Sequence, residues 1–451
     1  MTLAVDLVRS ELAALLGESK VTSDPASCAA FAVDGKSPGC AVYPCSAEQV
    51  AAVLRYAADH ALAVLPCRNA TKLDTGNPPQ HYDIALSLKE LNQVWHYEPA
   101  DLTISVEPGM KFGDFQHFVG RHRLWLPIDP RGGAKASLGG ILATNSAGPL
   151  RLRYGAPRDM VLGLKIATTE GKIIKTGGRV VKNVAGYDLG KLLVGSYGSL
   201  GVIVESSLKL FPLPAERVTV VLRAGTLGTA RDLRRRILHS PLDPLRMTLL
   251  DPRAATLARA GTSAGGETTD HEVWVEVAGS ARVIERCERE LADLGRAAGA
   301  PWARTETGET AELWGRIADP WAWLKDAYPD AVVLRIGLPI ARSEEFLGRA
   351  QQEVDRESVG LAGLAQVGVG TVTLCLLEPK RAREFLGIVL RLRRAAEDLG
   401  GTLLIEHCPW EFKREMEVWG SPGDGFDVMR RIKAAWDPKG ILSPGRFLGG
   451  L

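Results

Sequence analysis

The sequence lacks the features that would place the protein in a membrane, on nucleic acid or around a metal cluster. No apolar run approaches the ~20 residues needed to span a bilayer. The formal net charge is only +2, and scattered Lys and Arg residues give no basic surface for nucleic acid. The seven cysteines include no C-x-x-C pair, so they suggest neither an iron–sulfur cluster nor a zinc site. Their simplest interpretation is reduced thiols in a cytosolic protein.

Two common nucleotide-binding motifs are also absent. The chain has no G-x-x-x-x-G-K-[ST] loop, which argues against a P-loop enzyme. Within residues 195–203, Gly195-Ser196 and Gly198-Ser199 are offset from the G-x-S-x-G nucleophile elbow of α/β-hydrolases. Gly195, Gly198 and Gly201 have the wrong spacing for G-x-G-x-x-G, and they precede a predicted strand. A nicotinamide-binding Rossmann site is therefore not expected.

At 451 residues the chain is too long for one compact core, and Pro212-Leu213-Pro214 predicts a domain boundary. Beyond that boundary the pattern predicts an antiparallel sheet with helices packed on one face, an α+β domain. Two similar α+β halves remain an open arrangement there. In this part we expect strands at 218–222, 273–277, 332–336, 371–376 and 402–406, and helices at 230–238, 283–298, 343–355 and 381–399.

The first part of the chain predicts a mixed α/β arrangement. Ser46 takes the N-cap position of a helix, with Gln49 at capping-box spacing. The loop at 67–76 follows a strand, at the sheet edge where α/β folds bind ligands. Here we expect helices at 4–17 and 47–59, strands at 41–43, 63–66, 84–88 and 103–106, and a β-hairpin over 160–176.

Three glycine-bearing clusters lie between Pro130 and Pro214 in a fixed order. They run from 137 to 148, from 177 to 188 and from 195 to 203. Because a bare Cα permits positive φ and close approach, successive N–H groups in such loops can converge on a pyrophosphate. The alternative is that the glycines only end helices and strands. Three clusters with interleaved Ser, Thr and Asn favour a dinucleotide site.

This pattern resembles the FAD-binding half of the vanillyl-alcohol oxidase and p-cresol methylhydroxylase superfamily, and within it the FAD-binding subunits of bacterial glycolate oxidases. The resemblance covers most of residues 35–214, with RYGAPRDMVLG at 153–163 as its most specific stretch. It returns at the C-terminus in VWG at 418–420 and DPKGILSPGRF at 437–447.

The resemblance implies an α+β fold: a two-part FAD-binding domain of the p-cresol methylhydroxylase type plus an α+β cap. The implied divisions are an N-terminal helical segment at 1–34, the FAD-binding domain at 35–214, the cap domain at 215–408 and a C-terminal segment at 409–451 that returns to the FAD domain.

In this family the first phosphate loop reads R-G-G-G-T-K or similar, whereas here residues 67–72 read CRNATK. Asn69 tolerates the left-handed region, but that conformation at Arg68 or Ala70 would cost about 1–2 kcal/mol each. Two outcomes are open. The loop keeps its shape, with the Thr71 N–H and hydroxyl donating and Arg68 adding a countercharge, or the pyrophosphate site is broken.

The resemblance implies FAD as cofactor, and the first loop has no histidine for a covalent link. Small residues of the second cluster would face the pyrophosphate and ribityl chain, and the third cluster opens a strand whose backbone pairs with the cofactor. The stretch 182–188 resembles a family loop near the isoalloxazine, where Tyr187 either contacts the ring or is structural. The predicted cofactor-binding residues are Arg68, Asn69, Ala70, Thr71, Gly76, Ser137, Gly139, Gly140, Thr144, Ser146, Gly148, Gly198, Gly201, Val202 and Ile203.

The predicted cap offers little substrate chemistry. Related D-2-hydroxy-acid dehydrogenases carry closely spaced His and Glu residues that resemble a metal site. This cap has only three histidines, and the adjacent pair Glu406-His407 has either a catalytic role or a surface or interface role. We assign no metal site and no catalytic residue. Four tryptophans are core or interface residues, or else a substrate wall: Trp314, Trp321, Trp323 and Trp410.

The resemblance implies the FAD-binding subunit of a glycolate oxidase-type complex that oxidises glycolate or D-lactate to the 2-oxo acid. The implied partners are a second FAD-containing 2-hydroxy-acid dehydrogenase subunit and an iron–sulfur subunit, in the cytoplasm or peripheral at the inner membrane through the complex. Two alternatives are open: a flavin-free structural subunit of such a complex, and a stand-alone flavin-dependent alcohol oxidase.

Overall fold

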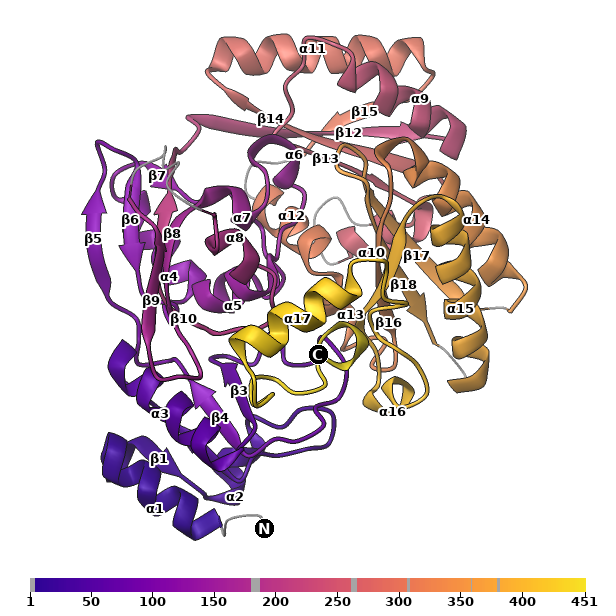
Figure 1. Ribbon diagram of the computed structural model, residues 1–451. Coiled ribbons are helices and arrows are strands. Elements are labelled where there is room, and N and C mark those ends of the chain that lie inside the picture. The colour runs from indigo at the N-terminus through magenta and orange to yellow at the C-terminus, as the bar shows by residue number, and fades with distance from the viewer. Residues whose placement is uncertain (1–4, 180–186, 261–265, 306–308, 358, 379–381) are drawn as a thin grey trace. The chain divides into compact units, whose positions relative to one another are not determined.

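The chain divides into two compact units, each built from several segments of the sequence (Figure 1). The computed structural model describes residues 5–179, 187–260, 266–305, 309–357, 359–378 and 382–451. The first unit contains residues 1–146, 156–213 and 417–451, and the second contains 147–155 and 214–416. Residues 5–34 lie in the first unit, and the C-terminal part of that unit begins at 417.

The first unit begins with a four-stranded sheet whose strand order is β1-β2-β4-β3. Strands β2, β4 and β3 are parallel, and β1 pairs antiparallel with β2. The loop at 67–76 therefore leaves the carboxyl end of β3, as expected. The elements of this region are α1 (Val5–Leu16), η1 (Glu18–Lys20), β1 (Val21–Thr22), α2 (Pro25–Ala29), β2 (Cys40–Val42), α3 (Ala47–His60), β3 (Val64–Cys67) and β4 (Ile84–Ser87).

An antiparallel five-stranded sheet, β5-β6-β10-β8-β9, completes the first unit with the short pair β7 and β11. Buried side chains of α3 share one core with strands of both larger sheets. The N-cap of α3 is Ser46, as predicted, because the Ser46 hydroxyl accepts from Gln49 N at 3.2 Å. The strands are β5 (Val94–Glu98), β6 (Thr103–Val106), β7 (Leu124–Trp125), β8 (Val161–Ala167), β9 (Ile173–Gly177), β10 (Val202–Lys209) and β11 (Phe211–Pro212).

The first unit also contains several short helices and one longer helix near the C-terminus. The isolated parallel bridge between Val64 and Leu442 brings the returning C-terminal segment beside β3. These elements are α4 (Phe112–Gly120), η2 (Gly133–Lys135), α5 (Leu138–Thr144), α7 (Pro157–Met160), α8 (Gly190–Leu193), α17 (Phe426–Trp436) and η4 (Leu448–Gly450).

The second unit is built on an eight-stranded antiparallel sheet in the order β15-β12-β14-β13-β17-β18-β16-β19. Each half follows the β-α-β-β-α-β order of a ferredoxin-like unit, and β13 pairs with β17 to join the halves. Two similar α+β halves therefore make the cap. The strands are β12 (Glu216–Ala224), β13 (Arg246–Leu250), β14 (His271–Gly279), β15 (Trp302–Arg304), β16 (Val332–Gly337), β17 (Gly360–Gln366), β18 (Thr371–Leu377) and β19 (Thr402–His407).

Helices cover both faces of this sheet, which corrects the expectation of one covered face. The long helices α9, α11, α14 and α15 match the predicted ones; Gly295 of α11, for example, approaches the Leu222 side chain of β12. The neighbouring Val221 faces the opposite side, in a core with α10, α12 and α13. The helices are α6 (Arg151–Tyr154), α9 (Leu227–Leu238), α10 (Pro252–Arg259), α11 (Ala281–Ala297), α12 (Thr310–Ala318), α13 (Pro320–Leu324), η3 (Ile340–Arg342), α14 (Ser343–Asp355), α15 (Ala382–Asp398) and α16 (Trp410–Lys413).

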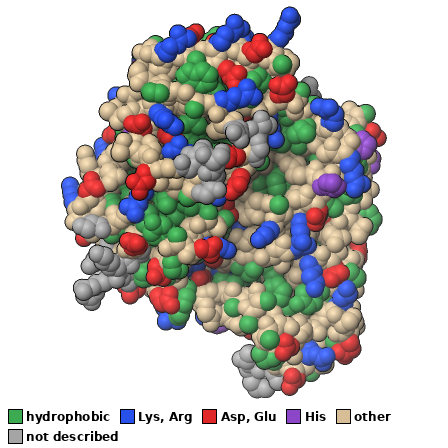
Figure 2. Space-filling view, turned by 180° about the vertical axis from the view of Figure 1, so that it is seen from behind, with side chains coloured by type: hydrophobic (Ala, Val, Ile, Leu, Met, Phe, Trp, Pro, Cys, Tyr) green, Lys and Arg blue, Asp and Glu red, His purple; other side chains and the backbone are tan. Residues whose placement is uncertain are grey.

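Acidic and basic side chains are interspersed on the face that Figure 2 shows. This distribution fits the near-neutral net charge and gives no single-sign patch on that face. Over the residues that the structure describes, no helix is both long and apolar enough to cross a membrane.

Candidate cofactor site

The glycine-poor loop at 67–76 needs only one left-handed residue at the three exchanged positions. Ala70 has a φ of 56°, whereas Arg68 and Asn69 stay outside the positive-φ region. The conformational cost of about 1–2 kcal/mol therefore falls on Ala70 alone. Arg68, for which the same cost was considered, does not incur it.

The side chains of Arg68 and Asn69 anchor the front of this loop. Arg68 Nε donates to Gly109 O at 2.9 Å, and Asn69 Nδ2 donates to Lys135 O at 2.6 Å. Burial lowers the pKa of the Arg68 guanidinium, and the charge of Asp114 opposes that shift. Both side chains thus bind main-chain carbonyls outside the loop.

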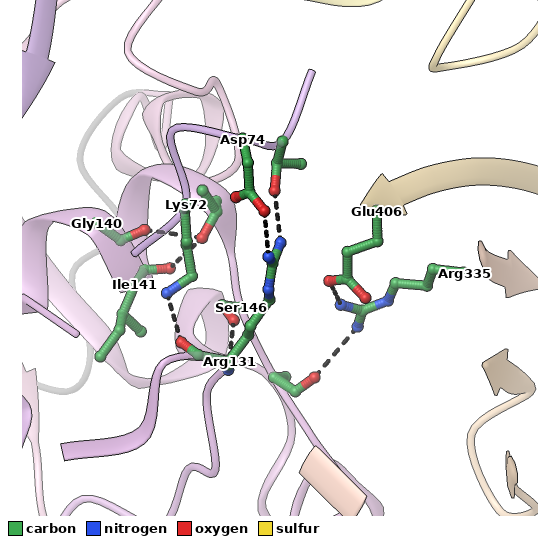
Figure 3. Close-up of polar contacts among 11 residues, drawn as sticks. Lys72, Asp74, Arg131, Gly140, Ile141, Ser146, Arg335 and Glu406 are labelled. Carbon is green, nitrogen blue, oxygen red and sulfur yellow. Dashed lines mark hydrogen bonds and ion pairs between the residues drawn. The ribbon is translucent and has the colours of Figure 1, made fainter. Parts of the chain in front are cut away.

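Arg131 holds the middle of the same loop (Figure 3). Its guanidinium donates to Thr75 Oγ1 at 2.8 Å and pairs with Asp74 Oδ2 at 2.6 Å. In return, Lys72 Nζ donates to the Arg131 carbonyl at 2.8 Å. Because Arg131 is only 7% exposed, water screens these contacts weakly.

Arg446, from the returning C-terminal segment, holds the back of the loop. Its Nη2 donates to Leu73 O at 2.6 Å and Thr75 O at 2.5 Å, and its Nη1 donates to Asn77 O at 3.3 Å. Burial lowers the pKa of this guanidinium, while Asp34, at 3.9 Å, favours the charged form. Several long-range hydrogen bonds therefore fix a loop that lacks the glycine triplet of the family at residues 68–70.

The second cluster forms the start of α5. The Ser137 hydroxyl caps the helix by accepting from Gly140 N at 3.2 Å, and Thr144 Oγ1 donates to Gly140 O at 2.7 Å. A Cβ at Gly139 would lie 2.6 Å from Pro108 Cβ, so this position requires glycine for packing. A Cβ at Gly140 would meet only the Ser137 hydroxyl, at 3.1 Å. The two adjacent glycines thus have different surroundings.

The third cluster contains a tight turn before β10. Tyr197 and Gly198 have φ values of 55° and 72°, and Ser199 N donates to Ser196 O at 3.1 Å. Two central residues with positive φ and this hydrogen bond define a type I′ turn. Gly201 follows where a Cβ would lie 2.7 Å from the Ile166 side chain. The chain then enters β10 at Val202, as predicted.

The first loop and parts of the second and third clusters line one pocket of the first unit. It encloses about 980 Å³ of space, open mouth included. The predicted cofactor residues in its lining are Arg68, Asn69, Ala70, Thr71, Ser137, Gly139, Gly140, Thr144, Gly198, Gly201, Val202 and Ile203.

Three predicted residues do not line this pocket. Gly76 has a φ of 99° and packs against the Arg446 carbonyl, so it shapes the loop from behind. The Ser146 hydroxyl accepts from Arg131 N at 3.2 Å. Gly148 belongs to the second unit. Of the middle cluster, residues 180–186 lie outside the described residues, and the Tyr187 side chain is 94% exposed.

The lining of this pocket offers main-chain donors for a diphosphate. Among the described residues, the N–H groups of Asn69, Ala70, Thr71 and Gly198 form no hydrogen bond with the protein. Converging amides of this kind bind anions, and the Thr71 hydroxyl adds another donor. The donor set and the open space beside Gly140 fit a dinucleotide.

Sequence reasoning missed several pocket residues. Lys72 and Arg446 carry no local motif for their contacts, and Tyr197 occupies a left-handed position that usually takes Asn, Asp or Gly. Ser443, also in the lining, lies in the C-terminal stretch that resembles the family ending. That ending was the signal that could have identified the C-terminal contributions.

In the second unit, Arg335 of β16 and Glu406 of β19 form an ion pair at 3.5 Å, and Arg335 Nη2 donates to Ala147 O at 3.1 Å (Figure 3). His407 stacks on Trp321 with ring centroids 3.5 Å apart. Trp314 is fully buried and donates to Thr219 Oγ1, so it is a core residue. Within the described ranges, no three His, Cys, Asp or Glu side chains gather as a metal site.

Family models match both parts of the chain. Residues 38–177 match the FAD binding domain, and residues 213–447 match the C-terminal domain of FAD linked oxidases. The chain belongs to the FAD-linked oxidases. FAD is accordingly the cofactor, and the protein is an oxidoreductase. The second match alone spans more than half of the chain, and the predicted family is confirmed.

Relatives and solved structures agree with this assignment. The chain is 26% identical to the glycolate oxidase subunit GlcD of Bacillus subtilis, over 91% of this chain and 89% of that protein. It is 28% identical to the mitochondrial D-lactate dehydrogenase (cytochrome) of Arabidopsis thaliana, over 91% and 73%. The p-cresol methylhydroxylase structure covers 98% of this chain and has 96% of its own length covered, with a TM-score of 0.74 at 16% identity, which confirms the predicted fold.

Proposed function

We propose that this protein oxidises a small 2-hydroxy acid, glycolate or D-lactate, to the 2-oxo acid as the FAD-binding subunit of a glycolate oxidase-type complex. The observation that carries the proposal is the pocket in which amides of the first loop and the third cluster stand free beside the start of α5. Similarity to proteins named for glycolate and D-lactate supports the substrate class.

Polar and apolar residues of this pocket would contribute differently to cofactor binding. The N–H groups of residues 69–71 would donate to the diphosphate, together with the Thr71 hydroxyl and Gly198 N–H. The side chains of Leu88 and Val202 add apolar surface that excludes water. Bound FAD would supply the two-electron acceptor for the substrate hydrogen.

The proposed complex contains a second FAD-containing 2-hydroxy-acid dehydrogenase subunit and an iron–sulfur subunit, in the cytoplasm or at the inner membrane through its partners. All seven cysteines are free thiols. Because this chain has no C-x-x-C pair, electrons would leave the flavin to oxygen or to a partner. Similarity to a protein named as a subunit favours a partner.

The proposal is tested with purified protein. We expect visible flavin absorbance, extractable FAD, and reduction of the bound flavin by glycolate or D-lactate when the complex is intact. A colourless preparation that stays colourless after FAD is added would favour the flavin-free alternative. Isolation without an iron–sulfur protein, together with rapid oxygen-dependent turnover of another alcohol, would favour the stand-alone oxidase.

A further inference from the structure

A buried lysine of α17 joins the third glycine cluster to the C-terminal segment. Lys433 Nζ donates to Asp437 Oδ2 at 2.7 Å, to Ser199 O at 2.8 Å and to Leu442 O at 2.9 Å. An ammonium has three donors, so its hydrogen-bonding capacity is fully used. Lys433 is 9% exposed, and a buried charge with such complete pairing has a defined position.

Asp437 fixes the C-terminal side of this junction. Its carboxylate accepts from Ile441 N at 3.1 Å and from Leu442 N at 2.8 Å, besides pairing with Lys433. The same stretch joins β3, since Val64 N donates to Ile441 O at 2.8 Å and Ser443 N donates to Val64 O at 3.0 Å. Asp437 therefore links Lys433 to the C-terminal residues that pair with β3, the strand that leads into the first phosphate loop.

The other end of the junction is the type I′ turn. Ser199 ends this turn, and Tyr197 and Gly198 at its centre both line the pocket. A residue with a Cβ is disfavoured in the left-handed region by about tenfold, so Tyr197 needs support from its surroundings. Its ring packs against Trp419 at 4.7 Å and Phe447 at 5.5 Å, and Lys433 holds the carbonyl two residues later.

We propose that Lys433 is a positioning residue for the FAD site: its ammonium holds the strained turn at 196–199 against the C-terminal segment. This inference rests on FAD binding in the described pocket. No contact of Lys433 with the cofactor is required. Without the ammonium, the turn relaxes to ordinary backbone angles and Gly198 N–H leaves the pocket.

The test compares Lys433→Met with Lys439→Met, an exposed lysine of the same segment. FAD affinity of the apoprotein is measured by fluorescence titration, and folding by circular dichroism and thermal unfolding. We expect Lys433→Met to weaken FAD binding by about tenfold or more, and Lys439→Met to stay within about twofold of the wild type. Equal affinities of both variants and the wild type would overturn the inference.

A double-mutant cycle with Tyr197→Gly distinguishes positioning of the turn from a purely structural role of Lys433. The Tyr197→Gly substitution removes the backbone strain of the turn, and the cycle measures FAD affinity. If Lys433 acts through the turn, Lys433→Met loses several-fold less affinity in the Tyr197→Gly background than alone. Additive losses would contradict the inference. Should Lys433→Met not fold, Lys433→Arg replaces it in the cycle, with the same two outcomes. Failure of the wild type to bind FAD refutes the proposed function instead.

Discussion

Two adjacent glycines of α5 should respond to alanine in opposite ways. A Cβ at Gly140 meets only the Ser137 hydroxyl, and Gly140 lines the pocket, so an added methyl would enter space meant for the cofactor. In a helix, Ala is favoured over Gly by about 1 kcal/mol. Gly140→Ala should therefore keep or raise the stability of the apoprotein. It should weaken FAD binding by about 1–3 kcal/mol, or roughly 5- to 150-fold.

At Gly139 the added Cβ would instead lie 2.6 Å from Pro108 Cβ and 3.2 Å from Pro108 O. Gly139→Ala should lower the free energy of unfolding of the apoprotein by about 1–3 kcal/mol, because backbone must move. The control is Gly315→Ala on α12 of the other unit, where nothing lies within 4 Å of the new Cβ. It should gain helix stability and leave FAD affinity unchanged.

The assays are urea unfolding of the three apoproteins and titration with FAD. A Gly140→Ala variant with wild-type FAD affinity would refute the assignment of the open space beside α5 to the cofactor. Equal loss of apoprotein stability in both α5 variants would refute the difference between their surroundings.

Three further outcomes are expected. Ala70→Gly removes the left-handed penalty and should raise the free energy of unfolding by about 1 kcal/mol in urea, after the added entropy of the unfolded chain; an unchanged value contradicts the role of φ. Arg446→Lys removes the guanidinium whose two nitrogens donate to three carbonyls of the loop, and it should weaken FAD binding about tenfold, as measured by titration. The control Arg430→Lys, at an exposed position, should leave FAD affinity unchanged. Burial raises the pKa of Asp251 from 3.8 to about 6, so its stabilising contribution is complete below the unfolded pKa and is lost as pH rises through 6. Between pH 3 and pH 7 the free energy of unfolding of Asp251→Asn should therefore rise by about 3 kcal/mol relative to that of the wild type, because only the wild type has this titrating group. A difference between the two proteins that does not change with pH would contradict this.

Features set by local sequence could be predicted. The Ser46 cap and the hairpin of β8 and β9 follow from cap spacing and turn chemistry. The long cap helices follow from apolar periodicity. By contrast, β17 reads GLAGLAQ, with no β-branched residue, and its strand conformation comes from pairing with β13 and β18. Helices α10, α12 and α13, which cover the second face of the cap sheet, were missed for a related reason. Their position depends on packing against strands from distant parts of the chain.

The site shows the same division between local and distant determinants. The pocket lining formed by the glycines of α5 and of the segment before β10 could be predicted from the spacing of these glycines in the sequence. No pattern within residues 67–76 predicts that their carbonyls accept hydrogen bonds from Arg446. This arginine lies more than 350 positions away in the sequence. The contacts of Lys433 with Ser199, 234 positions away, are equally invisible to local patterns.

The exchange of the glycine triplet therefore does not by itself break the phosphate loop. Glycine allows a loop to reach a left-handed turn at low cost, whereas here one residue, Ala70, incurs about 1–2 kcal/mol. Hydrogen bonds to charged groups contribute about 1.5–3 kcal/mol each, and Arg131 and Arg446 provide several to this loop. The cost is small beside that restraint. A loop held in this way is also ordered before the cofactor arrives, so binding loses less entropy than it would with a glycine-rich loop.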